Sequence, residues 1–378
     1  MKKKVALLGA TGSIGKSALD VLRAERDLLE PVLFTGHTET EGLLALAREF
    51  PGVALALSGR AGGSGDIRYY GREGLFRAIA ECGADIAVNG ITGAAGFEPS
   101  LAVLESGADL ALANKETIVM AAPLVLALAK KKGARILPVD SEHQAIFSLL
   151  EAHGREQVEE ILLTASGGPF RKYSLSELAG VRAEDALVHP TWSMGPKITV
   201  DSASMANKGL EVIEAAGLFG AAPEGITVVI HPQSIVHSLV RLRDGAVYGQ
   251  LSRPDMRLPI QHALLYPERG DCPFGRLSFD ALTLEFEKPD GKRFPMLPLA
   301  YEAARRGGFY PAAYNAANEE GVSAFLAGTL GFLDIPRIVE YVLAEDWIPA
   351  GEPSPESILD ADRKSRKIAL HYIGSGEK

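Results

Sequence analysis

Apolar and polar positions alternate in the first third of the chain as they do where strands are followed by helices. Short apolar runs typical of buried strands lead into turns and then into segments with helical spacing. This alternation predicts a parallel sheet with right-handed crossovers, and such sheets bind ligands at the carboxyl ends of their strands. The expected strands are residues 4–8, 31–34, 85–88 and 109–112, and the expected helices are residues 16–23 and 43–49.

The middle third has a different pattern and predicts an α+β domain. Three apolar runs predict strands, and we expect them to share one antiparallel sheet. The expected strands are residues 161–164, 226–230 and 246–251.

Residues 188–197, VHPTWSMGPK, follow neither the strand period nor the helical period. Trp192 and Met194 of this segment are either core anchors or parts of a mobile lid over a site, and the segment alone favours neither. A helix is expected over residues 201–219. Because positions three and four apart are neighbours on a helix, one of its faces carries Asn207, Lys208 and Glu211.

Turn residues are frequent after residue 271 and predict a linker, whereas the pattern from residue 299 onward is helical. We interpret this last region as a helical bundle that buttresses the rest. The expected parts are a Rossmann-like parallel-sheet domain (1–140), a central α+β domain with a lid loop (141–270), a linker (271–298) and a C-terminal α-helical domain (299–378).

Composition narrows the class of protein. A chain of 378 residues is too long for one ordinary core, and its net charge of −9 gives no reason to expect nucleic acid or an anionic membrane as a partner. Cys82 and Cys272 lie far apart in no metal or redox spacing, which favours a reducing, cytoplasmic location. The start of the chain is interpreted as a first strand rather than a signal peptide, and no apolar run has the length of a membrane helix.

The turn GATGSIG follows the first expected strand. Its glycines have GxxGxxG spacing and would let the backbone approach a pyrophosphate at a helix N-terminus, although a tight turn that binds nothing has the same pattern. An NAD site usually has a carboxylate at the end of the second strand, to bind the ribose. The residues there are Gly36, His37 and Thr38, with no carboxylate before Glu39, which favours NADP.

The stretch PVDSEHQAIFS places carboxylates at the end of an apolar run. Asp140 and Glu142 repel each other unless one is protonated or a cation lies between them. With Glu211 they form an oxygen donor set suited to a hard cation, Mg²⁺ or Mn²⁺. Alternatively, Asp140 or Ser141 caps a helix and Glu211 pairs with Lys208. Without a partner at a readable spacing, histidines such as His143 and His231 are more often structural than catalytic.

Eight motifs occur in order along essentially the whole chain. They are GATGSIG, ANKE (113–116), VDSEHQAIF (139–147), TASGGPF (164–170), HPTWSMGPKITVDSASMANKGLE (189–211), HPQS (231–234), PDMRLPI (254–260) and NAANE (315–319). Together they closely resemble the 1-deoxy-D-xylulose 5-phosphate reductoisomerase family. The resemblance implies an NADPH- and divalent-metal-dependent rearrangement and reduction of 1-deoxy-D-xylulose 5-phosphate to 2-C-methyl-D-erythritol 4-phosphate, in the non-mevalonate isoprenoid pathway. With the exposed strand expected at 246–251, it also implies a homodimer through the middle domain's sheet.

The resemblance also implies roles for individual residues. The implied metal ligands are Asp140, Glu142 and Glu211, which with Lys115 and His189 form the implied catalytic set. The implied substrate contacts are Lys115, Ser141, Glu142, Ser166, His189, Ser202, Asn207, Lys208 and Glu211. The implied NADPH contacts are Thr11, Gly12, Ser13, Ile14, Asn114, Glu116 and Gly195, beside Gly36, His37 and Thr38 from the second strand end. Trp192 and Met194 would form the lid.

Two positions depart from the family's pattern. Ala10 replaces a frequent Ser, which should be harmless beside a backbone-lined phosphate site. His37 replaces a basic Lys or Arg, so the preference for NADP should weaken as the pH rises. Two alternatives remain at this point: an enzyme of the semialdehyde dehydrogenase type, which would share the first domain, and a non-catalytic dinucleotide sensor, which is a different class of protein. A semialdehyde dehydrogenase would need a thiol nucleophile, and a non-catalytic dinucleotide sensor would not need the three carboxylates.

Overall fold

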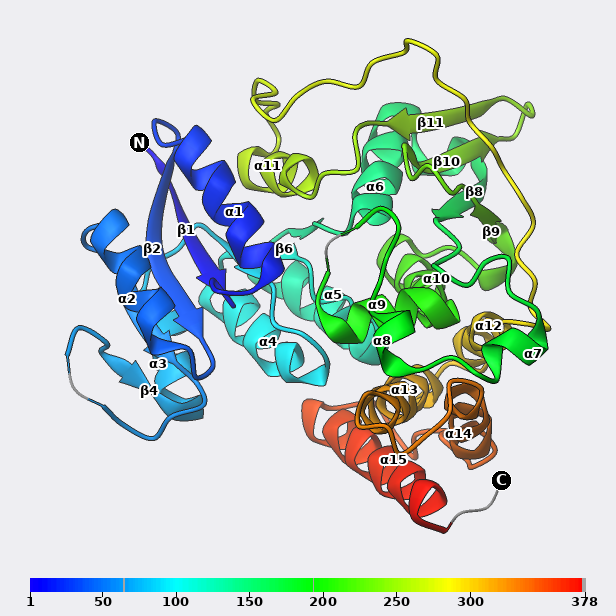
Figure 1. Ribbon diagram of the computed structural model, residues 1–378. Coiled ribbons are helices and arrows are strands. Elements are labelled where there is room, and N and C mark those ends of the chain that lie inside the picture. The colour runs from blue at the N-terminus through cyan, green and yellow to red at the C-terminus, as the bar shows by residue number, and fades with distance from the viewer. Residues whose placement is uncertain (64, 193, 376–378) are drawn as a thin grey trace. The chain divides into compact units, whose positions relative to one another are not determined.

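The computed structural model describes residues 1–63, 65–192 and 194–375 (Figure 1). The chain forms two compact units. Unit 1 consists of Met1–Thr117, Val125–Gln144 and Asp255–Arg276, and unit 2 consists of Ile118–Leu124, Ala145–Pro254 and Leu277–Lys378. The expected fold class is confirmed, since the chain has a parallel α/β sheet, a second sheet and a helical C-terminal region. The finer division at residues 140, 270 and 298 stays a prediction.

Unit 1 is built on a seven-stranded parallel sheet with the order β4-β3-β2-β1-β5-β6-β7. The chain fills one side of β1 first and then crosses to the other side, so the strand order reverses between β1 and β5. Such a switch point opens a crevice for ligands at the carboxyl ends of the strands. The strands are β1 (Lys3–Leu8), β2 (Leu29–Gly36), β3 (Ala54–Leu57), β4 (Tyr69–Tyr70), β5 (Ile86–Asn89), β6 (Asp109–Leu112) and β7 (Ile136–Pro138).

Helices cover this sheet because its strands are apolar on both faces; Val5, Leu33 and Leu110 are fully buried. The helix α5 has non-helical angles at Ala121, two residues before Pro123, and α5 and α6 contribute residues to both units. The helices that contribute to unit 1 are α1 (Ser13–Ala24), α2 (Thr40–Glu49), α3 (Gly71–Glu81), α4 (Phe97–Ser106), α5 (Glu116–Lys132), α6 (Ser141–His153) and α11 (Arg257–Leu265), with the 3₁₀ turn η1 (Ala94–Gly96).

Unit 2 contains a four-stranded sheet with the order β11-β10-β8-β9. The expected antiparallel sheet needs a correction. The strand β10 is antiparallel to both its neighbours, but β8 and β9 are parallel. Parallel neighbours need a long crossover, and the helices between β8 and β9 supply it. The strands are β8 (Val158–Ala165), β9 (Ile226–Ile230), β10 (Val236–Leu242) and β11 (Val247–Leu251).

One helix was expected over residues 201–219, and the structure has two, α9 and α10. Met205 separates them with a φ of 66°, a left-handed conformation that ends a helix. The short helices before this pair are α7 (Leu175–Leu178) and α8 (Ala183–Ala186), and the pair itself is α9 (Pro196–Ser204) and α10 (Ala206–Phe219).

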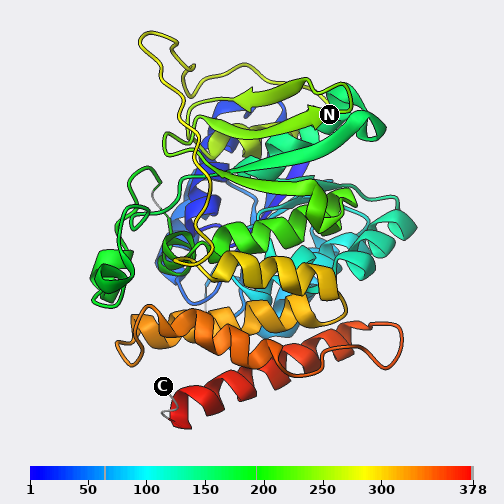
Figure 2. The ribbon, with the colours of Figure 1, turned by 90° about the vertical axis from the view of Figure 1, so that its right-hand side faces the viewer.

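The C-terminal helices pack around α13, which contacts α12, α14 and α15 and also reaches α9. Figure 2 shows these four helices, coloured yellow to red, lying side by side. The remaining elements are α12 (Met296–Arg306), α13 (Tyr310–Leu326), α14 (Asp334–Leu343), α15 (Pro355–Ser375), η2 (Arg155–Gln157) and η3 (Pro223–Gly225). Before α12, the expected linker pairs with the sheet through the bridge between Ile230 and Glu287. Among the described residues, no helix combines the length and the apolar character needed to cross a membrane.

Candidate active site

The glycine turn after β1 is closed too tightly for side chains. Gly9 has a φ of 85°, and a Cβ there would lie 3.2 Å from the carbonyl oxygen of Gly90. At Gly15 a Cβ would lie 2.3 Å from the Ala10 carbonyl oxygen. Gly12 is the N-cap of α1 and provides no side-chain cap, so the first backbone N–H groups of α1 are not covered by a capping side chain. This turn has the geometry that lets a phosphate approach a helix N-terminus.

The end of β2 presents no carboxylate to a ribose. Both Glu39 carboxylate oxygens accept from the Gly42 backbone N–H, at 3.0 and 2.9 Å, so Glu39 is the N-cap of α2. The exposed His37 ring lies 3.0 Å from the Ser58 hydroxyl through Nδ1. The Thr35 hydroxyl accepts from the Gly9 backbone N–H at 3.1 Å and so ties the glycine turn to β2.

Asn114 holds the loop that follows β5 in place. Its Nδ2 donates to the carbonyl oxygens of Ile91 and Gly93, at 2.7 and 2.8 Å. Its Oδ1 accepts from the Thr117 backbone N–H at 3.0 Å. The side chain that the family resemblance marks as an NADPH contact is therefore itself a brace for residues 91–93, next to the carboxyl ends of β5 and β6.

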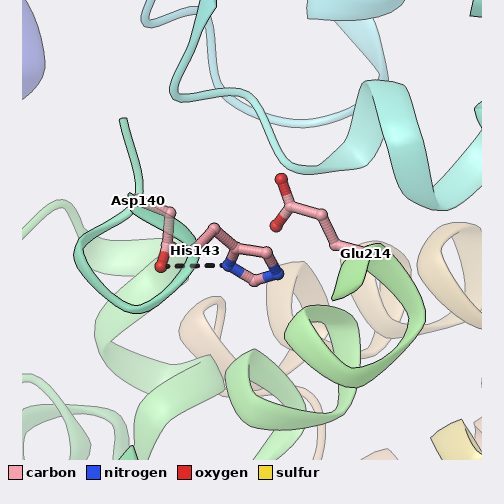
Figure 3. A group of neighbouring side chains, drawn as sticks. All are labelled: Asp140, His143 and Glu214. Atoms are coloured by element: carbon pink, nitrogen blue, oxygen red, sulfur yellow. Dashed lines mark hydrogen bonds and ion pairs between the residues drawn. The ribbon is translucent and has the colours of Figure 1, made fainter. Parts of the chain in front are cut away.

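Asp140 has a buried ion pair with a lysine. Its Oδ2 lies 2.7 Å from Lys115 Nζ, and the two side chains are 13% and 6% exposed. Its Oδ1 accepts from the Glu142 backbone N–H at 3.2 Å and lies 3.3 Å from Nδ1 of the buried His143 (Figure 3). Glu142 in turn accepts from the Ser141 hydroxyl. Asp140 thus caps the start of α6, as one interpretation of the sequence expected, and is also paired with Lys115.

On α10 of unit 2, the expected polar face is confirmed. Glu211 is 1% exposed and accepts from Asn207 Nδ2 at 2.6 Å and from Lys208 Nζ. Glu214, drawn in Figure 3, is also buried on α10. A Cβ at Gly209 would lie 2.7 Å from the Ala300 Cβ and from the Tyr314 hydroxyl, so glycine lets α10 pack closely on α12 and α13. Tight packing at Gly209 thus sets the position of the neighbouring Lys208 and Glu211.

His189 links the loop after β8 to the lid segment. Its Nδ1 accepts from the backbone N–H groups of Thr191 and Trp192, at 3.1 and 2.9 Å. In the neutral ring the proton must therefore be on Nε2, which lies 3.1 Å from the Ser166 hydroxyl oxygen and donates to it. Burial lowers the pKa of His189 below its ordinary value of 6.5, which favours this neutral ring.

Ser166 is left with a hydrogen to donate. Its hydroxyl oxygen accepts from His189 Nε2 and from the Gly168 backbone N–H, which is 3.2 Å away. A hydroxyl whose oxygen accepts two bonds can still donate one, and an anion is a favourable acceptor. The sequence could place Ser166 in a flexible turn, but it could not show which hydrogen bonds the hydroxyl accepts and that it can still donate one.

The segment with Trp192 and Met194 is anchored at both ends. At its start the Trp192 N–H is bound to His189, and at its end the Gly195 carbonyl accepts from the Thr199 backbone N–H at 3.1 Å and hydroxyl at 2.8 Å. Trp192 and Met194 are both half-buried, and the Trp192 ring centroid lies 6.4 Å from that of His237. Trp192 is thus neither a fully buried core residue nor free of contacts.

Each unit gathers part of the expected site. Unit 1 gathers two groups, one formed by the glycine turn and the ends of β2 and β6, and one formed by Lys115, Asp140, Ser141 and Glu142 at the start of α6. Unit 2 brings Ser166 to His189, and Asn207 and Lys208 to Glu211, with the half-buried Ser202 on α9. The sequence missed the buried pair of Asp201 and Asn318, although Asn318 lies in the quoted motif NAANE. The roles of individual residues in binding and catalysis stay predictions.

Comparisons with known proteins agree along the chain. Residues 5–122 match the 1-deoxy-D-xylulose 5-phosphate reductoisomerase family, residues 136–219 its C-terminal domain, and residues 251–368 the DXP reductoisomerase C-terminal domain. The reductoisomerase of Treponema pallidum is 48% identical over 98% of this chain and 97% of its own, and that of Chlorobaculum tepidum is 47% identical over 98% and 100%.

Solved structures agree as well. The Zymomonas mobilis enzyme in complex with NADPH is 39% identical with a TM-score of 0.90 and covers 99% of both chains. A DOX-P reductoisomerase in complex with NADPH, fosmidomycin and magnesium is 41% identical with a TM-score of 0.92 and covers 98% of both. The chain therefore belongs to the 1-deoxy-D-xylulose 5-phosphate reductoisomerase family.

Proposed function

We propose that the protein converts 1-deoxy-D-xylulose 5-phosphate into 2-C-methyl-D-erythritol 4-phosphate, with NADPH as reductant and a divalent cation, in the non-mevalonate isoprenoid pathway. It is an NADP-dependent oxidoreductase, and relatives named 1-deoxy-D-xylulose 5-phosphate reductoisomerase match it along nearly its whole length. The observation that carries the proposal is the pairing of two carboxylates, the half-buried Asp140 and the buried Glu211, each with a buried lysine. Each lysine balances the charge of its carboxylate while no cation is bound, and a divalent cation could take the place of the ammonium.

The residues present fit a hard divalent cation. Asp140, Glu142 and Glu211 offer only carboxylate oxygens, the ligands that Mg²⁺ and Mn²⁺ prefer. We assign these three as its ligands; a related structure in complex with magnesium makes Mg²⁺ the first ion to test and Mn²⁺ the second. When bound, the cation would act as a Lewis acid and template for the substrate's oxygens. Lys115 and Lys208, released from their carboxylates, would then be available to the substrate.

NADPH is assigned to the carboxyl ends of the strands in unit 1. The tight turn around Gly9 and Gly15 supports this assignment, as does Glu39, which is occupied as a helix cap rather than offered to a ribose. His37 would face the 2′-phosphate. The full set assigned to the dinucleotide is Thr11, Gly12, Ser13, Ile14, Gly36, His37, Thr38, Asn114, Glu116 and Gly195.

The substrate phosphate is assigned to unit 2. Lys208 provides a positive charge, and the Ser166 hydroxyl has a hydrogen to donate because His189 and Gly168 occupy its oxygen as donors. Ser202 and Asn207 add neutral donors. Through Nε2, His189 orients Ser166, and through Nδ1 it holds the start of the lid segment, so phosphate binding and lid position share one residue.

The rearrangement produces an aldehyde that has to be reduced before it escapes, so the site has to exclude water and retain the intermediate. Trp192 and Met194 are assigned to this role. Their half-buried side chains lie in an irregular segment anchored at His189 and Gly195. Lys115, Ser141, Glu142 and Glu211 are assigned to the substrate's oxygens.

A homodimer in the cytoplasm completes the proposal. The strand β11 is at one edge of the sheet in unit 2 and exposes Val247 and Tyr248, so it offers an unpaired edge and apolar side chains to a second copy. Light scattering at micromolar concentration tests this part, and a monomer mass would contradict it.

The activity is tested by following NADPH oxidation with 1-deoxy-D-xylulose 5-phosphate, with Mg²⁺ or Mn²⁺ and with a chelator. We expect turnover that needs both the sugar phosphate and the cation. Binding of NADPH without turnover under all these conditions would instead favour a dinucleotide sensor.

A further inference from the structure

The C-terminal helices contact α9 through a buried polar pair. Asn318 on α13 is fully buried, and its Nδ2 donates to Oδ1 of Asp201 at 2.8 Å. Asp201 is 1% exposed, and its Oδ2 lies 2.9 Å from Nζ of Lys197, one turn earlier on α9. Burying a carboxylate is costly unless charge and hydrogen bonds compensate for the lost water. The Asn318 amide and the Lys197 ammonium provide both kinds of compensation.

This pair holds the helix on which Ser202 lies. Ser202 follows Asp201 directly, and successive helix residues are about 100° apart around the axis, as 3.6 residues per turn require. Fixing the Asp201 side chain against α13 therefore fixes the rotation of α9 about its axis, and with it the direction of the Cα–Cβ bond of Ser202. Lys197 lies two residues after Gly195, so the same carboxylate also ties down the end of the lid segment.

Asn315 shows what is particular to Asn318. Both asparagines are fully buried on α13, and among the described residues neither Oδ1 has a hydrogen-bond partner. Asn315 Nδ2 donates to Glu319 Oε1 at 3.0 Å, within its own helix, whereas Asn318 Nδ2 donates to another helix. The two positions match in burial and chemistry and differ in whether they reach α9.

We propose that Asn318 is a positioning residue for the substrate-phosphate site, acting through Asp201 on Ser202, so that the C-terminal helices take part in substrate binding rather than only buttressing the fold. This inference rests on the proposed function. It assigns to α13 a task that requires no contact between α13 and the substrate.

The test compares Asn318→Leu with Asn315→Leu, two changes of the same size and chemistry. Removing the amide at 318 should raise the KM for 1-deoxy-D-xylulose 5-phosphate about tenfold. A hydrogen bond to a charged group stabilises the arrangement that it holds by at least about that factor, and here the arrangement is that of Asp201 and Ser202. The inhibition constant of inorganic phosphate should rise in parallel. The Kd for NADPH should stay the same in both variants, and Asn315→Leu should keep the parent's KM.

An exchange provides a second measurement in case Asn318→Leu does not fold. Asn318→Asp alone places a second carboxylate against Asp201, whereas Asn318→Asp combined with Asp201→Asn restores one amide–carboxylate pair with its direction reversed. The double variant should therefore have a lower KM for the sugar phosphate than the single Asn318→Asp variant.

Equal KM values in the two leucine variants would overturn the inference, as would an exchange variant no better than Asn318→Asp. Either result counts against the inference alone, because the parent would still turn over the sugar phosphate. A parent that oxidises no NADPH with this substrate and either cation would overturn the proposed function itself.

Discussion

The two ring nitrogens of His189 can be separated by substitution. Asparagine places an oxygen near the position of Nδ1 and can still accept from the Thr191 and Trp192 N–H groups, but it does not reach Ser166. Glutamine places an amide nitrogen near the position of Nε2 and can still donate to Ser166, but it offers no acceptor to the lid segment. His189→Asn and His189→Gln therefore remove opposite halves of one arrangement.

The expected size of each kinetic effect follows from the hydrogen bonds that the substitution removes. His189→Asn removes one hydrogen bond between neutral groups, about 0.5–1.5 kcal/mol, so the KM for the sugar phosphate should rise roughly two- to tenfold. His189→Gln releases two backbone N–H groups in a half-buried segment. We expect it to loosen the lid and lower kcat, with a smaller effect on KM.

Fluorescence gives a readout for the lid itself. The chain has two tryptophans, and Trp347 is 2% exposed, so quenching by acrylamide reports mainly on Trp192. Quenching should increase in His189→Gln and stay at the parent level in His189→Asn. If both variants show the same KM and the same quenching, His189 does not divide its work between Ser166 and the lid.

The pH dependence of this arrangement has a definite sign. Burial lowers the pKa of His189 below 6.5, so as the pH falls the unfolded chain takes up the proton before the folded chain does. The contribution of His189 to the free energy of unfolding is therefore complete above about pH 6.5 and is lost as the pH falls toward the lower folded pKa. This part of the acid destabilisation should be absent from His189→Asn, which chemical denaturation at a series of pH values can measure.

Three further predictions concern the metal ion, the dinucleotide and the lid. Asp140→Asn should keep the cap of α6, because Asn caps about as well as Asp. The variant should nevertheless lose most of its activity and regain part of it in excess Mn²⁺. Full activity at ordinary metal concentration would contradict the metal assignment. His37→Arg should raise the ratio of NADPH to NADH efficiency, because a permanent charge binds the 2′-phosphate more firmly than an imidazole does. An unchanged ratio would mean that residue 37 does not contact the 2′-phosphate. Trp192→Ala should lower turnover with little change in Tm. The control variant Trp347→Ala removes a buried tryptophan and should lower the free energy of unfolding by about 3–5 kcal/mol. A comparable loss of Tm in both variants would make Trp192 a core residue.

Long apolar periods and turn chemistry made most of the fold predictable. The expected strands at β1, β2, β5 and β6 are all present in one parallel sheet. The strand β3 has the sequence ALAL, in which alanine is a poor strand former, and β4 has only two residues, too few for a period to be visible. The strand β10 follows the turn-like HPQS. The break at Met205 could not be predicted, because methionine rarely adopts a left-handed conformation and only the surrounding packing holds it there.

The sequence indicated which residue types form the candidate site, but it indicated less about which of these residues contact one another. Motifs singled out Ser166, His189 and Glu211, but hydrogen-bond direction and burial exist only in three dimensions. The link from Asn318 to Asp201 joins positions 117 residues apart, and no local pattern indicates it. Asn114 was expected as a cofactor contact, and its role as a brace for residues 91–93 also depends on a fold that brings β5 beside β6.

The sequence allowed two interpretations of Asp140, as a helix cap or as a metal ligand. In the structure the two roles are compatible, because they use different carboxylate oxygens. The cap uses Oδ1, which accepts from the Glu142 N–H, while Oδ2 faces Lys115. A cation that displaced the Lys115 ammonium from Oδ2 would leave the cap intact, so the start of α6 would stay fixed. At the proposed metal site, a helix cap would therefore make Asp140 a better ligand, since it holds the carboxylate in one orientation before the ion arrives and reduces the ordering that binding requires.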